Sequence, residues 1–141
     1  QAKVLIVGSG HGQLAYAIAM QLAEYENLNK NKKQVELLAV DSSQNAIKYA
    51  KQASYSAQEL TGLSEELKKL YFTNSDGTER STVKDKIRQL VTFDQCDLTK
   101  DFQSIGLVDL IICPEVLVYF SNGVKAGILE QFSTLLKGGG I

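Results

Sequence analysis

The feature that most restricts the fold of this chain is a glycine-rich turn between a short apolar run and an amphipathic helix. The apolar run occupies residues 3–7, and the turn reads GSGHGQ over residues 8–13. A continuous apolar run that ends in glycines is typical of a strand buried on both faces. Residues 13–27 then place apolar side chains on one helix face, namely Ala15, Ile18, Ala19 and Leu22. The order strand, glycine turn, helix predicts the first unit of a parallel sheet.

The same alternation continues along the chain. Further strands are predicted at residues 35–40, 91–93 and 108–113, and a second helix at residues 44–53. A last helix is predicted from an apolar stripe made of Val124, Ile128, Leu129, Phe132, Leu135 and Leu136. Strands that alternate with helices pair in parallel through right-handed crossovers. The predicted fold class is α/β, a three-layer, Rossmann-like fold with a mostly parallel sheet.

Residues 54–90 fit this alternation poorly and are interpreted as an insertion. They contain a short helix candidate at residues 64–70 and a turn, NSDG, at residues 74–77. Two weak strand candidates lie at residues 70–73 and 83–87.

Composition and charge exclude several function classes. The hydrophobic share of 44% and charged share of 22% predict a packed globular core. A net charge of -1 provides no electrostatic attraction for nucleic acid phosphates or for an anionic membrane surface. No apolar run approaches the roughly 20 residues that span a bilayer. We therefore expect neither nucleic acid binding nor membrane insertion.

Cysteine and histidine usage is sparse. Cys96 and Cys113 lack CxxC spacing and the chain has one histidine, so we expect no metal site and no disulfide framework. Thiols of this kind suit a reducing compartment, which predicts a cytoplasmic location. The chain opens directly into a strand and stops at GGGI, residues 138–141, where another strand is expected. We interpret residues 1–141 as one domain that is incomplete at both ends.

The glycine turn and the end of the second strand indicate a nucleoside ligand. Glycines let the backbone approach a ligand and tolerate positive φ. A dinucleotide site would read GxGxxG, whereas Gly8, Gly10 and Gly12 give GxGxG, a spacing similar to the methyltransferase turn. Asp41 ends the second strand, where a carboxylate can accept hydrogen bonds from both ribose hydroxyls. The alternatives are a turn without a ligand and an aspartate that merely precedes a helix cap.

Two polar features are interpreted as solvated rather than functional. His11 could act as a base, but a lone histidine in a glycine loop is more often a solvated side chain. The lysines of residues 30–33 are interpreted in the same way, as part of an exposed loop.

Several segments in colinear order resemble the CheR-type enzymes, which methylate glutamates of bacterial chemoreceptors. The stretch GSGHGQLAYAIA at residues 8–19 is similar to the family's GCSTGEEPYSIA, and LAVD at residues 38–41 resembles LATD. VDLIICPEVLVYF at residues 108–120 resembles FDLIFCRNVLIYF, and LLKGGG at residues 135–140 resembles LLKPGG. Residues 53–72 resemble the family segment that leads into a small antiparallel β-subdomain. The resemblance thus implies a methyltransferase fold with such an insertion at about residues 70–90.

The resemblance also implies the cofactor and its site. S-adenosylmethionine would be bound through the turn, with Gly8, Ser9, Gly10, Gly12 and Gln13 along its methionine part. Asp41 would bind the ribose, Asp97 and Leu98 would lie along the adenine, and Cys113 and Pro114 would complete the site. Tyr119 would stand beside the sulfonium as the catalytic residue, where an aromatic ring gains cation–π attraction. No metal ligand is implied.

Two departures from the family pattern bear on activity. The family's acidic residue after the last glycine is Gln13 here, and its Arg-Asn pair is Pro114-Glu115. Pro114, in place of the arginine, lacks both a cation and a backbone donor, and Glu115, in place of the asparagine, would repel an anion by roughly 1 to 4 kcal/mol at close range.

The sequence therefore predicts a cytoplasmic methyltransferase acting on glutamate side chains of chemoreceptors or a related signalling protein. Transfer to an ionised carboxylate needs alignment and removal of water rather than a strong base. The alternative is a catalytically degenerate module that binds cofactor or receptor without turnover. A nicotinamide-dependent oxidoreductase is disfavoured by the glycine spacing.

Overall fold

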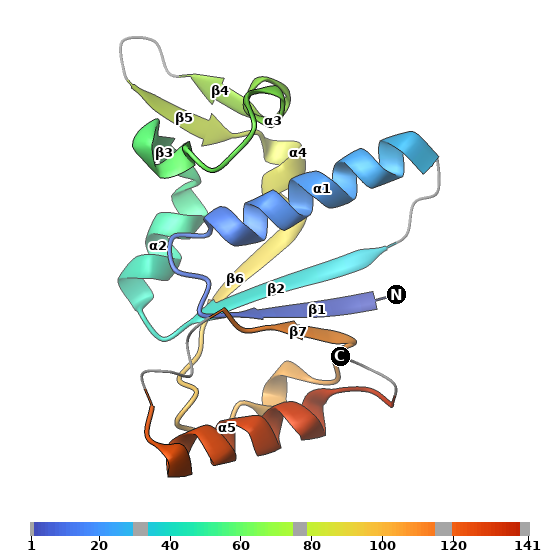
Figure 1. Ribbon diagram of the computed structural model, residues 1–141, viewed down its shortest axis with the longest axis vertical. Helices are drawn as coiled ribbons and strands as arrows, with labels where there is room; N and C mark the ends of the chain where they lie inside the picture. Colours follow the sequence, from blue (N-terminus) through green and yellow to red (C-terminus); the bar gives the residue numbers. More distant parts are fainter. Residues whose placement is uncertain (1, 30–33, 75–78, 115–119, 139–141) are drawn as a thin grey trace.

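Four parallel strands form the central sheet of the computed structural model, which describes residues 2–29, 34–74, 79–114 and 120–138 (Figure 1). In chain order they are β1 (Ala2–Val7), β2 (Val35–Asp41), β6 (Val91–Gln95) and β7 (Leu110–Ile112). Their order in the sheet is β6-β2-β1-β7, and each neighbouring pair is parallel. The chain thus starts in the middle of the sheet, builds outward to one side, and then crosses to the other side of β1.

Helices cover both faces of this sheet. Helices α1 (Gln13–Asn29) and α2 (Gln44–Gln52) lie on one face, and α5 (Asn122–Leu135) lies on the other with the short 3-10 helix η2 (Gln103–Ile105) (Figure 1). Strand β1 alternates between two cores, because Ile6 packs with the α1 side while Leu5 and Val7 pack with the α5 side. The predicted buried strand and the three-layer α/β fold class are confirmed.

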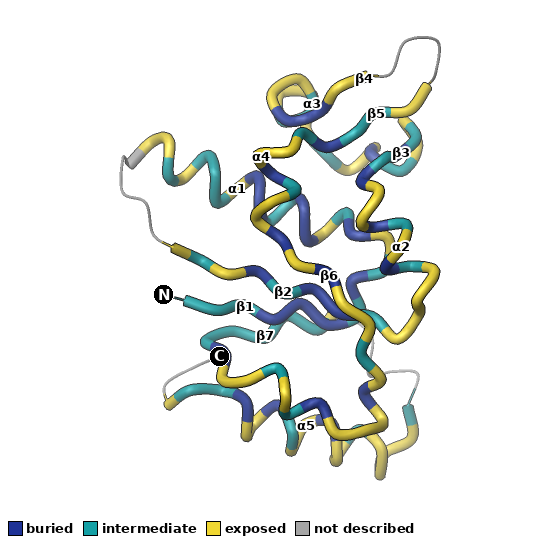
Figure 2. The backbone as a smooth tube through the Cα atoms, turned by 180° about the vertical axis from the view of Figure 1, so that it is seen from behind, coloured by how far each residue is buried: buried dark blue, intermediate teal, exposed yellow. Residues whose placement is uncertain are grey.

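A second, antiparallel sheet packs on the α1 side. It consists of β3 (Ser54–Ser56), β4 (Phe72–Asn74) and β5 (Arg80–Val83) in the order β3-β5-β4. The 3-10 helix η1 (Gln58–Leu60) and helix α3 (Glu65–Tyr71) connect β3 to β4. Tyr55, Tyr71 and Val83 are buried in the same apolar cluster as Tyr16 of α1. Figure 2 shows the buried segments of this unit facing α1. The small sheet therefore shares its core with the main domain.

The region of the insertion differs in detail from the sequence prediction. The strand predicted at residues 83–87 is wrong, since β5 ends at Val83 and helix α4 (Asp85–Arg88) follows. Helix α4 is a single turn that buries Ile87 and leaves Lys86 exposed. Because Ile87 is one apolar residue among charged ones, the sequence shows no helical periodicity here. Strand β3 was not predicted, because its three residues carry one apolar side chain and no period. The small sheet thus begins at Ser54, before the predicted range of 70–90.

The last helix also differs from its prediction in part. Ile128, Phe132 and Leu135 are buried as expected, whereas Val124 and Leu129 are exposed. Leu129 follows Ile128 by one residue, a rotation of about 100° around the helix, and so faces away from the sheet. The lysine loop of residues 30–33 and the turn at residues 75–77 lie outside the described residues. Among the described helices, none combines the length and the apolar character that crossing a bilayer requires.

Candidate functional site

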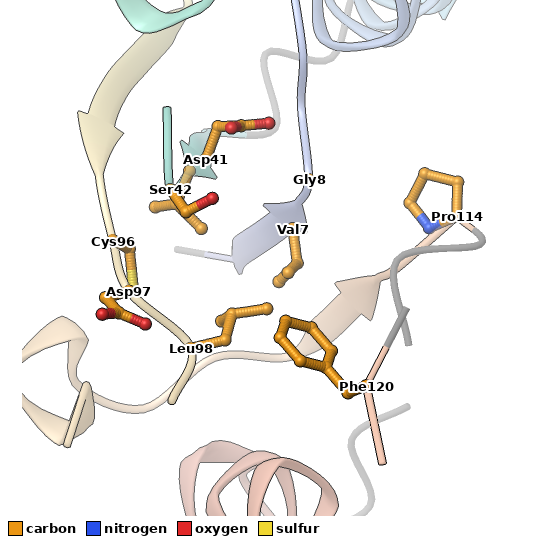
Figure 3. Close-up of a pocket in the computed structure, with 10 residues that line it drawn as sticks. Val7, Gly8, Asp41, Ser42, Cys96, Asp97, Leu98, Pro114 and Phe120 are labelled. Carbon is orange, nitrogen blue, oxygen red and sulfur yellow. The ribbon is translucent and has the colours of Figure 1, made fainter. Parts of the chain in front are cut away.

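A cavity of about 480 Å³ opens where the carboxyl ends of the four parallel strands meet (Figure 3). Loops from neighbouring β1 and β7 lead to helices on opposite faces, which leaves a crevice at this edge of the sheet. The volume lies in the range of small-molecule sites. The cavity is lined by residues that end or follow each strand, namely Val7, Gly8, Val40, Asp41, Ser42, Cys96, Asp97, Leu98, Pro114 and Phe120.

Asp41 lies on this cavity wall at the end of β2. Its Oδ2 accepts a hydrogen bond from the Gly10 N–H at 2.9 Å, and its Oδ1 accepts one from the Ser43 N–H at 2.8 Å. One carboxylate therefore joins the glycine loop to the start of α2, which Ser43 caps. A carboxylate offers about four lone-pair sites, so both oxygens retain capacity for a donor in the cavity. The arrangement suits a pair of ligand hydroxyls.

The glycine loop, defined as residues 8–12, begins at the cavity: Gly8 lines it, whereas Ser9 and Gly10 are not among the lining residues. Gly8 and Gly10 have φ angles of 71° and 56°, in the left-handed region that favours glycine. A Cβ at Gly10 would meet no atom within 4 Å, so the space beside it is open. Ser9 is 7% exposed, and its Oγ has no hydrogen-bond partner among the described residues. An open loop with an unsatisfied buried hydroxyl is compatible with a polar ligand.

Gly12 and Gln13 do not line the cavity. Gly12 has a φ of 93°, and a Cβ there would lie 2.9 Å from Ala50 Cβ, 3.0 Å from Phe93 Cζ and 3.1 Å from Tyr55 Oη. Its side of the loop therefore faces packed protein. Gln13 lies instead along a separate hollow of about 200 Å³ between α1 and the small sheet. The position after the last glycine is the first residue of α1.

The segment after β6 forms another wall. Asp97 is exposed, and its Oδ1 accepts hydrogen bonds from the Thr99 hydroxyl at 2.6 Å and the Thr99 N–H at 2.9 Å. These bonds hold the pKa of Asp97 below its ordinary value, so the carboxylate is ionised near neutral pH. Leu98 is 6% exposed and adds an apolar surface. Burial raises the pKa of the neighbouring Cys96 thiol, and the carboxylates of Asp97 and Asp94 raise it further.

The segment after β7 is described in part. Pro114 lies exposed at the cavity rim, while Cys113 is partly buried in the core on the α5 side and does not line the cavity. Tyr119 and Glu115 lie outside the described residues. Phe120 and Ser42 line the cavity but were not among the predicted site residues. The sequence could have indicated them through their neighbours, because Phe120 follows Tyr119 and Ser42 follows Asp41, and both neighbours were predicted site residues.

Two further observations concern metals and thiols. Among the described residues, no three histidine, cysteine or acidic side chains gather as a set of metal ligands. Cys96 and Cys113 form no disulfide.

Comparison with known proteins gives a family for this arrangement. All of residues 1–141 match the family model of the CheR methyltransferase, SAM binding domain. Chemotaxis protein methyltransferase 1 of Pseudomonas aeruginosa is 36% identical over 132 residues, which cover 92% of this chain and 48% of that protein. The chemotaxis protein methyltransferase of Vibrio anguillarum is 31% identical over 140 residues, covering 98% of this chain and 50% of that protein. The chain thus spans about half the length of these curated relatives.

Solved structures support the fold. A TehB-like SAM-dependent methyltransferase from Corynebacterium glutamicum matches 99% of this chain and 51% of its own, with a TM-score of 0.58 and 17% identity. PKMT2 from Rickettsia typhi in complex with AdoHcy matches 99% of this chain and 19% of its own, with a TM-score of 0.58 and 22% identity. The resemblance found in the sequence is confirmed: the chain belongs to the family of CheR methyltransferase SAM-binding domains, whose cofactor is S-adenosylmethionine.

Proposed function

We propose that this chain is the cofactor-binding part of a cytoplasmic methyltransferase that modifies glutamate side chains of chemoreceptors or a related signalling protein. The observation that carries the proposal is the Asp41 carboxylate, which lies on the wall of the cavity and holds the open glycine loop beside it. Membership of the CheR family and the names of the chemotaxis relatives support the choice of reaction and substrate class. The absence of a disulfide between the two cysteines is compatible with the location.

The wall residues divide into polar and apolar groups that match the parts of a nucleoside. Asp41 would accept hydrogen bonds from the ribose hydroxyls, and charged acceptors make such bonds strong. Leu98 and Phe120 belong to one apolar cluster and would contact the adenine, with Asp97 at its edge. The backbone of Gly8, together with that of Ser9 and Gly10, would follow the methionine part.

Methyl transfer to a carboxylate requires mainly that the protein positions the two reactants. S-adenosylmethionine, when bound, supplies a methyl group on a positively charged sulfur. The chain's own contribution would be to align that group with an ionised glutamate and to keep water from the nucleophile. Tyr119, which belongs to the segment between Pro114 and Phe120, would flank the sulfonium with its ring. No general base is needed, since the carboxylate nucleophile is already ionised at neutral pH.

One observation favours a second candidate, a module that binds cofactor or receptor without turnover. Pro114 occupies the cavity rim where the family pattern has an arginine, so this position offers neither a cation nor a backbone donor. A glutamate substrate would lack one attractive contact there.

Two measurements on the full-length protein test these proposals in sequence. Titration calorimetry with S-adenosylhomocysteine is expected to give one site per chain, and no binding would overturn the assignment. Transfer of labelled methyl to chemoreceptor fragments is then expected, and Asp41→Ala is expected to abolish it. Binding without any transfer would select the module without turnover.

Cys96 gives a separate prediction, because its thiol lines the cavity and its pKa is raised by burial and by nearby carboxylates. The thiolate is the reactive form, so alkylation of Cys96 by iodoacetamide should be slower at pH 7 than that of an exposed cysteine peptide, and should accelerate as the pH rises. Saturating S-adenosylhomocysteine should slow it by about tenfold or more. Peptide mass spectrometry reports the rate at Cys96 alone. An equal alkylation rate with and without S-adenosylhomocysteine would contradict binding of the nucleoside in this cavity.

A further inference from the structure

From the sequence, His11 is interpreted as a solvated side chain, but in the structure His11 contacts several other residues. Its side chain is 48% exposed, yet its ring stacks on the ring of Tyr49 in α2, with centroids 4.0 Å apart and planes inclined by 19°. Its Nδ1 lies 3.7 Å from Glu59 Oε2 of η1. Its carbonyl oxygen accepts a hydrogen bond from the Tyr55 hydroxyl of β3 at 2.5 Å. One loop residue thus contacts three separate elements.

The groups behind His11 are themselves fixed. The Tyr49 hydroxyl donates to both carboxylate oxygens of Glu59, at 2.8 and 3.0 Å. Arg80 of β5 donates to the Tyr49 hydroxyl at 2.8 Å and to the Ser54 carbonyl at 2.6 Å. Although burial opposes it, the hydrogen bonds from Ser56 and Tyr49 and the charge of Arg80 lower the pKa of Glu59. His11 therefore contacts a hydrogen-bonded cluster of Tyr49, Glu59 and Arg80. In this cluster Glu59 is ionised, and Arg80 belongs to the small sheet.

Hydrogen bonds of its own backbone also hold the loop, because the Gly10 N–H donates to Asp41 and the Gly12 N–H donates to the Ser9 carbonyl. Three of its five residues are glycines with positive φ, and glycine gives up more conformational freedom on ordering than other residues do. The Ser9 hydroxyl has no hydrogen-bond partner among the described residues. The loop's backbone is tied at its start, where the Gly8 and Ser9 N–H groups donate to the Val40 carbonyl. Near its other end, the loop makes a ring contact through His11, which stacks on Tyr49.

We propose that His11 is a positioning residue, which fastens the glycine loop to α2 and the small sheet and thereby sets the affinity for the cofactor. The inference rests on the proposed function, because it takes residues 8–12 as the loop that binds S-adenosylmethionine. His11 lies outside the cavity lining, so its effect is exerted through the loop backbone. The family turn quoted above has threonine at this place, so the stacked attachment is a feature of this chain.

Calorimetry of the full-length protein with S-adenosylhomocysteine tests this inference. His11→Ala is expected to raise the Kd by about fivefold, which is the range of one lost aromatic pair. His11→Phe retains a ring that can stack on Tyr49, and it is expected to stay within about twofold of the wild type. This rescue separates positioning by the ring from any role of the imidazole nitrogens. Gln21→Ala, at an exposed position of helix α1, which follows the loop, is the control and should leave the Kd unchanged.

Tyr49→Ala keeps the inference testable if His11→Ala fails to fold. It removes the other ring and leaves the loop sequence intact, so it is expected to give a similar loss of affinity. The double variant is expected to bind no more weakly than Tyr49→Ala alone, because the stacked contact is already absent from that variant. Unchanged affinity in His11→Ala or in folded Tyr49→Ala would overturn the inference. Failure of the wild type to bind S-adenosylhomocysteine would instead overturn the proposed function.

Discussion

Asp41→Ala is expected to weaken binding of S-adenosylhomocysteine by about 100-fold, because it removes charged hydrogen bonds worth about 1.5 to 3 kcal/mol each. The carboxylate accepts from the Gly10 and Ser43 N–H groups, so its removal releases the glycine loop from the start of α2. It would also remove the acceptor for both ribose hydroxyls. The loss of affinity therefore combines a lost ligand contact with a less ordered loop.

Calorimetry measures this loss, and Asp94→Asn provides a matched control. Asp94 is an exposed carboxylate on the neighbouring strand β6, opposite Val40 in the sheet register. Its removal changes the local charge equally but leaves the cavity wall intact, so the Kd should stay within about threefold of the wild type, as for a screened surface charge. If Asp41→Ala bound the nucleoside as tightly as Asp94→Asn, the ribose would lie elsewhere.

Gly12→Ala is expected to lower the free energy of unfolding by about 3 kcal/mol. The new methyl group would lie within 3.1 Å of atoms of Ala50, Phe93 and Tyr55, and the backbone would keep a φ of 93°. Overpacking of a core costs about 1 to 3 kcal/mol, and a left-handed conformation adds about 1 kcal/mol for an alanine. The atoms that crowd the site come from α2, β6 and β3, so relief by a single side-chain rotation is not available.

Thermal unfolding followed by circular dichroism measures this effect, with an expected decrease of about 10 °C in Tm. Gly10→Ala is the matched control, because its φ of 56° is also left-handed while its Cβ would meet no atom within 4 Å. It should lose about 1 kcal/mol through backbone strain alone. Equal losses in the two variants would show that crowding at residue 12 is absent.

The sequence predicts the parts of this structure that depend on local period. Buried strands and amphipathic helices leave clear patterns, so the order of the main elements could be predicted from residues 3–7 onward. Asp41 could be placed at the site because the end of a parallel strand fixes the edge of the sheet on which its side chain lies.

The parts that were missed depend on contacts between distant segments. Gly12 is required by side chains of three other elements, none of which is marked in the sequence as its neighbour. Gln13 lines the hollow beside the small sheet because it is the first residue of α1, which packs against that sheet. Strand β3 has a single buried side chain, Tyr55, which no periodicity analysis detects. His11 stacks on Tyr49 only because α2 and the glycine loop meet in space.

A crystal structure of the full-length protein with S-adenosylhomocysteine tests most directly whether this cavity is the cofactor site. We expect both ribose hydroxyls within about 3.2 Å of the Asp41 carboxylate and the adenine beside Leu98 and Phe120. The glycine loop should keep its hydrogen bond from the Gly10 N–H to Asp41. A nucleoside bound away from the ends of β1 and β2, with Asp41 making no contact to it, would contradict the account.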